Sequence, residues 1–348
     1  MADNIRVGLL GYGYASKTFH APLIAGTPGL TLAAITSRDA AKVHADWSQV
    51  RVADDPHTLF DDPELDLIVI ATPNDSHFPL ARQALKAGKH VVVDKPFTVT
   101  LSQARELHYL AEHTGKLLSV FHNRRWDSDF LTLKNLLHAG KLGDVVYFES
   151  HIDRFRPEVR QRWREQSGEG SGIWFDLAPH LIDQTLQLFG LPVALHADLA
   201  QIRPGSQTAD YFHATLIYPQ RRVVLHASMM AAAPTARYIV HGTQGSFVKF
   251  GTDPQEDRLK AGERPAQPDW GQDRQDGVLT LHQSGIMVEQ RIATLPGNYL
   301  AYYAAIRDAL NGKGDNPVPA RQAIQVMELI ELGLASYEHK KTLVLKNN

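Results

Sequence analysis

Short apolar runs alternate with amphipathic stretches through the first third of the chain. The apolar runs predict strands at residues 5–10, 30–36, 65–71, 90–93 and 117–121. Apolar positions at helical spacing predict helices between them, near residues 15–25, 40–46, 76–87 and 101–113. Strands that alternate with helices in this way are typical of repeated βα units and of a parallel sheet.

Two of the predicted helices carry sequence signals for their ends. Gly88 follows the third helix directly, where a glycine commonly ends a helix in the left-handed conformation. Thr100 and Gln103 have the spacing of a capping box and therefore predict the start of the fourth helix.

The rhythm changes after Phe121. A helix is predicted at 131–137, then a long alternating strand at 145–155 and a charged loop at 154–172. The next helix is expected at 173–189, with Pro179 in its first turn, where proline is tolerated. Residues 195–294 then consist mainly of strands, with runs at 195–203, 211–218, 223–229, 237–241 and 246–250.

The last part of the chain completes the second region. Residues 254–276 are polar and predict an excursion, and helices are expected at 299–310 and 320–337 before a short strand at 342–345. Successive strands without crossover helices favour an antiparallel sheet. The predicted fold class is therefore α/β, with a parallel-sheet domain at residues 1–122 and an α+β domain at 123–348 that has a large open, mainly antiparallel sheet.

Composition excludes several classes of protein. The 348 residues carry 36 Lys plus Arg against 38 Asp plus Glu, a net charge of -2 without a basic tract, so no nucleic-acid partner is expected. No cysteine is present, which rules out disulfides and thiolate catalysis. No apolar run approaches the length of a membrane span, and the N-terminus enters a strand without a leader-like segment. We therefore expect a soluble, cytoplasmic protein with no membrane partner.

A glycine-rich turn joins the first predicted strand to the first helix. Gly11 suits the tight turn, and Gly13 would let a pyrophosphate approach the backbone at the helix N-terminus. Ser16 occupies the third position of the fingerprint and is small enough for close helix packing. In this strand–turn–helix context the motif predicts a Rossmann domain that binds a dinucleotide through Gly11, Tyr12, Gly13, Tyr14 and Ser16.

The second predicted strand ends in Ser37, Arg38 and Asp39. An arginine at this tip suits the extra phosphate of NADP, whereas an acidic residue suits the ribose hydroxyls of NAD. Because Ser37 and Arg38 come first, NADP is favoured and NAD remains possible. Asp39 either caps the next helix or reaches the ribose.

The strand at 65–71 also ends in polar residues. Thr72, Pro73, Asn74 and His77 lie at the carboxyl edge, where the nicotinamide half of a cofactor would run, and we expect cofactor contacts from them. The alternative is ordinary capping of the next helix by residues 74–76.

The run at 90–93 reads as a strand buried on both faces, and it stops at Asp94, Lys95 and Pro96. Pro96 fixes the strand end, so Lys95 is presented rigidly at the edge where ligands bind. The alternative is a surface lysine paired with Asp94.

Asp176 and His180 are four residues apart, so they share one face of a helix. Histidine suits proton transfer near neutral pH, and a carboxylate beside it could orient the ring or bind a substrate hydroxyl. The alternative is a helix-start aspartate and a buried, satisfied histidine. No third protein ligand accompanies the pair, so no metal site is expected.

These motifs together resemble the glucose–fructose oxidoreductase / inositol dehydrogenase / MocA (Gfo/Idh/MocA) family over essentially the whole chain. The glycine turn, the Asp94-Lys95-Pro96 strand end and the Asp176/His180 pair match its motifs, although the family usually has Glu in place of Asp94. Further runs resemble the subgroup of NADP-dependent scyllo-inositol dehydrogenases, at residues 122–127, 156–159, 162–165 and 182–186.

The resemblance implies an NADP-dependent oxidoreductase, with NAD possible, that interconverts a secondary alcohol of a cyclic polyol or sugar and its ketone. Lys95 and His180 would carry the proton chemistry beside Asp176, while Asp94, Lys95 and Asn123 would join the cofactor site. It also implies a homodimer or homotetramer, formed through the open sheet.

Other side chains and other functions stay open. Candidates for the substrate wall are Arg124, Arg154, Trp163 and Arg164, each with a salt-bridge or packing alternative. Basic groups lining the pocket would also allow an acidic sugar. The alternative functions are reduction of another keto sugar or aldose derivative, and a catalytically silent sensor that binds NAD(P).

Overall fold

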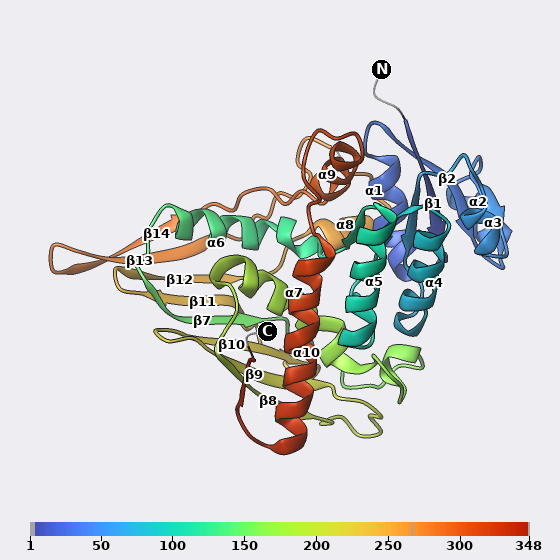
Figure 1. Ribbon diagram of the computed structural model, residues 1–348. Coiled ribbons are helices and arrows are strands. Elements are labelled where there is room, and N and C mark those ends of the chain that lie inside the picture. The colour runs from blue at the N-terminus through green and yellow to red at the C-terminus, as the bar shows by residue number, and fades with distance from the viewer. Residues whose placement is uncertain (1–3, 266, 347–348) are drawn as a thin grey trace. The chain divides into compact units, whose positions relative to one another are not determined.

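The computed structural model describes residues 4–265 and 267–346, which form two compact units (Figure 1). The first unit is built from the described parts of three segments, Met1–Trp126, Pro254–Trp270 and Asn298–Ile324. The second unit takes the rest of the described chain. The domain boundary after residue 122 remains a prediction. The structure shows that two later segments, Pro254–Trp270 and Asn298–Ile324, pack with the first unit.

A six-stranded parallel sheet forms the centre of the first unit. Its order is β3-β2-β1-β4-β5-β6. The strands are β1 (Ile5–Leu10), β2 (Leu30–Thr36), β3 (Arg51–Ala53), β4 (Leu67–Ile70), β5 (His90–Val93) and β6 (Leu118–Val120). The chain order reverses between β1 and β4, and such a switch point opens a ligand crevice at the carboxyl ends of the strands. The predicted Rossmann sheet is confirmed.

The helices of this sheet begin and end largely where local signals place them. They are η1 (Ser16–His20), α1 (Ala21–Ala25), α2 (Ala40–Asp46), α3 (His57–Phe60), α4 (Asn74–Lys86) and α5 (Leu101–Thr114). The Thr100 hydroxyl accepts from Gln103 N, and the Gln103 side chain returns to the backbone of Thr100, which confirms the capping box. Gly88 follows α4 with a φ of +76°, as a glycine helix stop requires. The short elements β3 and α3 were not predicted.

Two late segments complete the first unit. The polar excursion predicted at 254–276 contains α8 (Gln255–Lys260), and its first part belongs to this unit together with α9 (Leu300–Leu310). The Gln255 side-chain oxygen accepts hydrogen bonds from Trp270 Nε1 at 3.0 Å and from Tyr299 N at 2.8 Å. These bonds join the two late segments, and Gln255 Nε2 donates to the Trp126 carbonyl at 3.3 Å, which ties them to the first segment of the unit.

A nine-stranded sheet forms the second unit, in the order β14-β13-β12-β11-β7-β10-β9-β8-β15. The neighbouring pairs are antiparallel except β7 with β10, which is parallel, so the predicted open, mainly antiparallel sheet is confirmed. Its strands are β7 (Val145–His151), β8 (Ala194–Ala200), β9 (Tyr211–Ile217), β10 (Arg222–Ser228), β11 (Ala236–Gly242), β12 (Gly245–Phe250), β13 (Gly277–Gln283), β14 (Ile286–Ile292) and β15 (Leu343–Val344).

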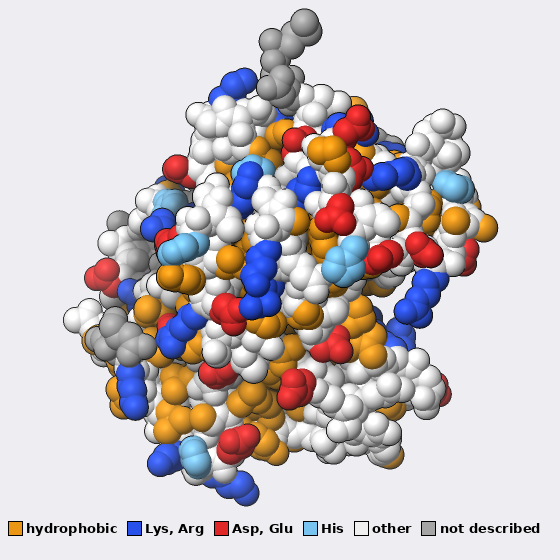
Figure 2. Space-filling view, turned by 45° about the vertical axis from the view of Figure 1, so that its right-hand side comes forward, with side chains coloured by type: hydrophobic (Ala, Val, Ile, Leu, Met, Phe, Trp, Pro, Cys, Tyr) orange, Lys and Arg blue, Asp and Glu red, His pale blue; other side chains and the backbone are white. Residues whose placement is uncertain are grey.

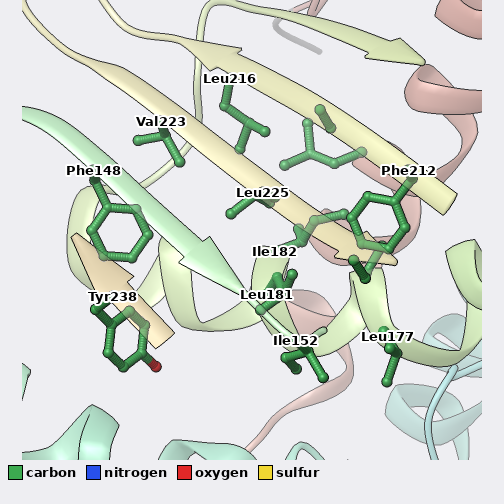
Figure 3. Packing of buried hydrophobic residues seen from close by; sticks show 14 of the residues in the cluster. Phe148, Ile152, Leu177, Leu181, Ile182, Phe212, Leu216, Val223, Leu225 and Tyr238 are labelled. Carbon is green, nitrogen blue, oxygen red and sulfur yellow. The ribbon is translucent and has the colours of Figure 1, made fainter. Parts of the chain in front are cut away.

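Helices cover one face of this sheet and close its hydrophobic core. They include α6 (Ser128–His138), α7 (Gly172–Phe189) and most of α10 (Ala320–His339). Figure 3 shows Leu181 and Ile182 of α7 beside Leu225 of β10, and Phe212 of β9 nearby. The short η3 (Trp163–Glu165) lies in the loop before α7.

The prediction that Pro179 sits in the first turn of its helix is wrong. The helix α7 begins at Gly172, whose φ of +84° suits glycine, and Pro179 lies inside it. Proline donates no backbone hydrogen bond, so the helical bond from this position is missing. The proline therefore interrupts the backbone ladder in the turn that carries Asp176 and His180.

On the face shown in Figure 2, acidic and basic side chains are interspersed, and neither sign gathers into one continuous patch. Among the described residues, no helix is both long enough and apolar enough to cross a membrane.

Candidate active site

The glycine turn after β1 has the geometry that a bound phosphate requires. Gly11 has a φ of +83°, and a Cβ there would lie 3.1 Å from Thr72 Cγ2, so β4 approaches the turn closely. Its backbone N–H donates to Thr36 Oγ1 at 2.8 Å, which ties the turn to the end of β2. At Gly13 an added Cβ would meet nothing within 4 Å, so the backbone there is open to a ligand.

The helix that follows begins as a π-helical turn, η1, which continues into α1. Ser16 is completely buried, and its hydroxyl has no hydrogen-bond partner among the described residues. The small side chain keeps the helix close to the sheet, as the third fingerprint position requires. The open backbone at Gly13 and this close helix start fit the pyrophosphate of a dinucleotide.

A cavity of about 400 Å³ lies beside the glycine turn. Gly13 and Tyr14 line it, and so do basic side chains from three other places in the first unit. These are Lys17 of η1, Lys42 of α2, and Lys260 and Arg264 of the α8 segment. Asp46 and Glu263 also line it, so the cations are only partly balanced. A net basic cavity next to a phosphate turn suits an anionic cofactor.

At the end of β2 the polar residues Ser37, Arg38 and Asp39 make different contacts. Asp39 caps α2, because its Oδ1 accepts from Lys42 N at 3.0 Å. Ser37 Oγ donates to the Asp39 carbonyl at 3.1 Å, and Arg38 is exposed. Of the two roles considered for Asp39, the structure shows the helix cap.

At the end of β4, His77 joins two strand ends. Its Nδ1 lies 2.9 Å from the Pro96 carbonyl, and its Nε2 lies 3.0 Å from the Thr72 carbonyl. Asn74 is buried, and Pro73 precedes α4 without a side-chain cap, so the capping alternative for residues 74–76 is wrong. Cofactor contacts from Thr72, Pro73, Asn74 and His77 stay predictions.

The end of β5 presents Lys95 beside a buried carboxylate. Asp94 is 7% exposed, and its Oδ1 accepts from Lys95 N at 2.7 Å. Its Oδ2 lies 3.7 Å from Nε2 of His20, whose Nδ1 lies 2.6 Å from the hydroxyl of Tyr303. Asp94 therefore pairs with an imidazole inside the first unit, and Lys95 is half-buried next to it.

Burial acts to raise the pKa of Asp94, but His20 and the charges of Lys95 and His77 outweigh it. Together they lower the pKa to about 2. The carboxylate is therefore ionised at every physiological pH. The end of β5 therefore places a fixed negative charge directly before Lys95 in the chain.

The second predicted cluster lies on α7 in the second unit. His180 is 5% exposed, and Asp176 is partly exposed one helical turn before it. Arg164 Nε lies 3.6 Å from Asp176 Oδ1, and the Arg164 guanidinium stacks 4.7 Å from the centre of the Trp163 ring. The structure thus brings Asp176 together with one predicted wall residue, Arg164, on which a second, Trp163, stacks.

The other two wall candidates make different contacts. Arg154 is partly exposed in the loop after β7, and its N–H donates to the Ser228 carbonyl at 2.8 Å. In the first unit, Arg124 is 2.7 Å from Glu256 Oε2, so its salt-bridge alternative is what the structure shows. Asn123 is buried at the start of η2 (Asn123–Trp126), directly after β6.

Sequence reasoning missed the residues that hold these groups in place. Glu256 of α8 accepts from Tyr14 OH at 2.8 Å and pairs with Arg124 and Lys260, so it links the glycine turn to η2. Burial acts to raise its pKa, but Arg124, Lys260 and Tyr14 hold the pKa well below its usual range. His20 was missed as well. Both contacts join segments far apart in the chain, so no local pattern marks them.

The fold and the turn define a dinucleotide-binding protein of the doubly wound α/β class. Residues 5–122 match the description "Oxidoreductase family, NAD-binding Rossmann fold", and residues 134–345 match "Oxidoreductase family, C-terminal alpha/beta domain". The chain belongs to the Gfo/Idh/MocA oxidoreductase family, and its cofactor is a nicotinamide nucleotide. The resemblance inferred from the sequence is confirmed.

Three relatives show how far the similarity extends. YdgJ of Escherichia coli K12, named as an uncharacterized oxidoreductase, is 71% identical and covers 99% of this chain and 100% of its own. IolW of Bacillus subtilis 168, named scyllo-inositol 2-dehydrogenase (NADP(+)), is 38% identical and covers 99% of this chain and 97% of its own. The structure of the oxidoreductase YPO2259 of Yersinia pestis is 68% identical with a TM-score of 0.97, covering 100% of this chain and 99% of that one.

Proposed function

We propose that this oxidoreductase is an NADP-dependent dehydrogenase that interconverts a secondary alcohol of a cyclic polyol or sugar and the corresponding ketone. Scyllo-inositol is the first substrate to test. Support for this substrate class comes from IolW, whose name gives that activity and which is similar over nearly the full length of both chains.

The observation that carries the proposal is the position of Lys95. It stands at the end of β5, and β5 neighbours β4, which in turn neighbours the β1 strand that leads into the glycine turn. The carboxyl ends of these parallel strands share one edge, where a bound dinucleotide lies. The carboxylate of Asp94 is buried and ionised beside it, and its Oδ1 accepts from Lys95 N at 2.7 Å, which fixes the backbone that presents the lysine.

In this proposal the bound cofactor supplies the acceptor for a hydride from the carbinol carbon. His180 takes the proton of the reacting hydroxyl during oxidation and returns it during reduction. Lys95 donates a hydrogen bond to the oxygen as it becomes negative, which stabilises the developing alkoxide. Asp176 binds a neighbouring hydroxyl or orients His180, and Arg164 and Trp163 hold Asp176 in place.

The preference for NADP rests on the tip of β2. Arg38 is exposed there, and Asp39, the residue that would favour NAD, is already used to cap α2. A charged hydrogen bond contributes about 1.5–3 kcal/mol, so Arg38→Ala should lower the ratio of NADP to NAD specificity by roughly tenfold or more. Arg82→Ala, which removes an exposed arginine on α4, should leave this ratio unchanged.

We further propose a homodimer or homotetramer formed through the face of the nine-stranded sheet opposite the core. Side chains on that face are only half-buried, among them His196, His213 and His226. Size-exclusion chromatography with light scattering tests this, and a monomer at micromolar concentration would contradict it.

The test of the catalytic roles is steady-state oxidation of inositol isomers with NADP and NAD. General acid–base groups contribute about 10²–10⁴ in rate, so Lys95→Ala and His180→Ala should each lower kcat by roughly 100-fold or more. Lys86→Ala and His138→Ala, at exposed helix positions of the two units, serve as matched controls. Near-wild-type turnover in both site variants would refute the assignment, and activity only on keto sugars would favour the alternative reductase.

A further inference from the structure

Four polar side chains form a row across the face of the nine-stranded sheet that points away from the core. The register pairs Asp198 of β8 with His213 of β9, His213 with His226 of β10, and His226 with His151 of β7. These positions alternate with core residues such as Phe148, Phe212 and Leu225, which Figure 3 shows on the α7 side. The row therefore lies on the face opposite Asp176 and His180 and belongs to no step of the proposed reaction.

Three members of this region converge on one point. His151, Asp153 and His226 each offer a ligand atom, and these atoms lie within 4.8 Å of one another. Asp153 Oδ2 is 3.6 Å from His151 Nδ1, and Asp153 Oδ1 is 3.4 Å from His226 Nε2. Both distances exceed the 2.7–3.2 Å typical of a hydrogen bond. The edge of a tetrahedral site is roughly 3.3–3.4 Å for bonds of about 2.0–2.1 Å, so the His226 distance matches it and the His151 side chain would need only a small shift to close on an ion.

The surrounding residues orient these ligands as a cation would need. His151 Nε2 lies 2.9 Å from Glu149 Oε2, which turns the other ring nitrogen, Nδ1, toward Asp153 Oδ2 at 3.6 Å. That Nδ1 is buried and has no hydrogen-bond partner among the described residues. Tyr147 donates to the same Glu149 carboxylate. A carboxylate behind a ligating histidine is the usual outer sphere of a zinc site.

The carboxylate of Asp153 is also held in place. Ser228 N donates to Asp153 Oδ1 at 2.9 Å, which fixes one oxygen toward His226. The ring of His213 lies 5.8 Å from that of His226 and is a candidate fourth ligand in competition with water.

We propose that His151, Asp153 and His226 bind a divalent cation that prefers imidazole and carboxylate ligands, with Zn²⁺ as the ion to test. Glu149 is the positioning residue for His151. Because β7 and β10 are the parallel pair at the middle of the sheet, the bound ion would cross-link two strands that are distant in the chain. Its role would be structural, and it is independent of the dehydrogenase proposal.

The experiment is equilibrium dialysis of the full chain, stripped with a chelator, against Zn²⁺, with Mg²⁺ as the oxygen-preferring control ion. We expect one Zn²⁺ per chain and no stoichiometric Mg²⁺. Asp153→Asn and His226→Gln should abolish binding, and Glu149→Gln should weaken it roughly 10–100-fold. His196→Gln removes another histidine from the same face and should bind as wild type does.

Further measurements separate binding from folding. Co²⁺ loaded in place of Zn²⁺ should give the strong visible absorption of a tetrahedral centre, and the absorption should be lost in His226→Gln. Thermal melting without metal shows whether each variant is folded. If a ligand variant does not fold, Glu149→Gln still tests the site, because it keeps all three ligands. Wild type without stoichiometric Zn²⁺, or Asp153→Asn and His226→Gln proteins that bind Zn²⁺ as wild type does, would overturn the proposal.

Discussion

Replacing Asp94 with asparagine removes the negative charge buried beside Lys95 but keeps the oxygen that accepts from Lys95 N. The pKa of Asp94 is about 2 in the folded protein, against about 3.9 for an aspartate in an unfolded chain. A folded-state pKa below the unfolded value means that the ionised carboxylate stabilises the fold above about pH 4. This stabilisation is lost as the pH falls toward the folded value of about 2.

The size of the effect follows from the same shift. A difference of roughly two pKa units corresponds to about 2–3 kcal/mol of unfolding free energy at neutral pH. Urea unfolding of wild type and Asp94→Asn between pH 7 and pH 3 measures it through tryptophan fluorescence. The gap between the two proteins should be constant from pH 7 to about pH 5 and should shrink by about half near pH 3. A gap that does not change with pH would refute the pairing of Asp94 with His20.

The remaining predictions concern single substitutions. Gly13→Ala should keep the melting temperature but weaken NADP binding by tenfold or more in calorimetric titration. Gly168→Ala, which also adds a Cβ in open space, should change neither quantity. Equal NADP affinities of the two variants would contradict a phosphate-binding turn at Gly13. Gly333→Ala places a Cβ 2.2 Å from the buried Trp174 ring and should cost about 1–3 kcal/mol in urea unfolding, and an unchanged midpoint would contradict this packing. Thr100→Ala should cost about 1 kcal/mol, and no loss would mean that the capping box contributes nothing.

Local signals were sufficient for most of the first sheet. Mostly apolar runs predicted β1, β2 and β5 with the bounds that the structure has, because most side chains of these central strands are buried. The capping box predicted the start of α5 for a similar reason, since its two side chains bond to backbone within one turn. In contrast, β3 is only three residues long and half-exposed, so its composition differs little from a loop.

Contacts between distant segments were beyond the reach of sequence patterns. Nothing near Glu256 indicates that α8 packs against η1 in the first unit, and nothing near His20 indicates that it pairs with Asp94. The sequence did mark Asp94 as a departure from the family, where glutamate is usual. The structure adds a physical setting for the shorter side chain, which pairs with an imidazole and accepts from its own neighbour in the chain.

The candidate residues of the second unit show the same division. Helical spacing placed Asp176 and His180 on one face of α7, and the structure agrees with a helix at both positions. The prediction for Pro179 was wrong although the helix starts at Gly172, within one residue of the predicted start, because Pro179 lies well beyond the first turn counted from there. Arg164 and Trp163 were predicted wall residues, and the contact of Arg164 with Asp176 and its stacking on Trp163 became visible only in the structure.

The most direct test of the proposed reaction follows the transferred atom itself. The protein is incubated with oxidised NADP and scyllo-inositol that carries deuterium on its ring carbons, and the reduced cofactor is examined by mass spectrometry. Hydride transfer from the carbinol carbon predicts reduced NADP that carries the label, with formation strongly slowed in Lys95→Ala. Reduced cofactor without deuterium, or none at all with any inositol isomer, would contradict the proposal that this protein oxidises a ring alcohol.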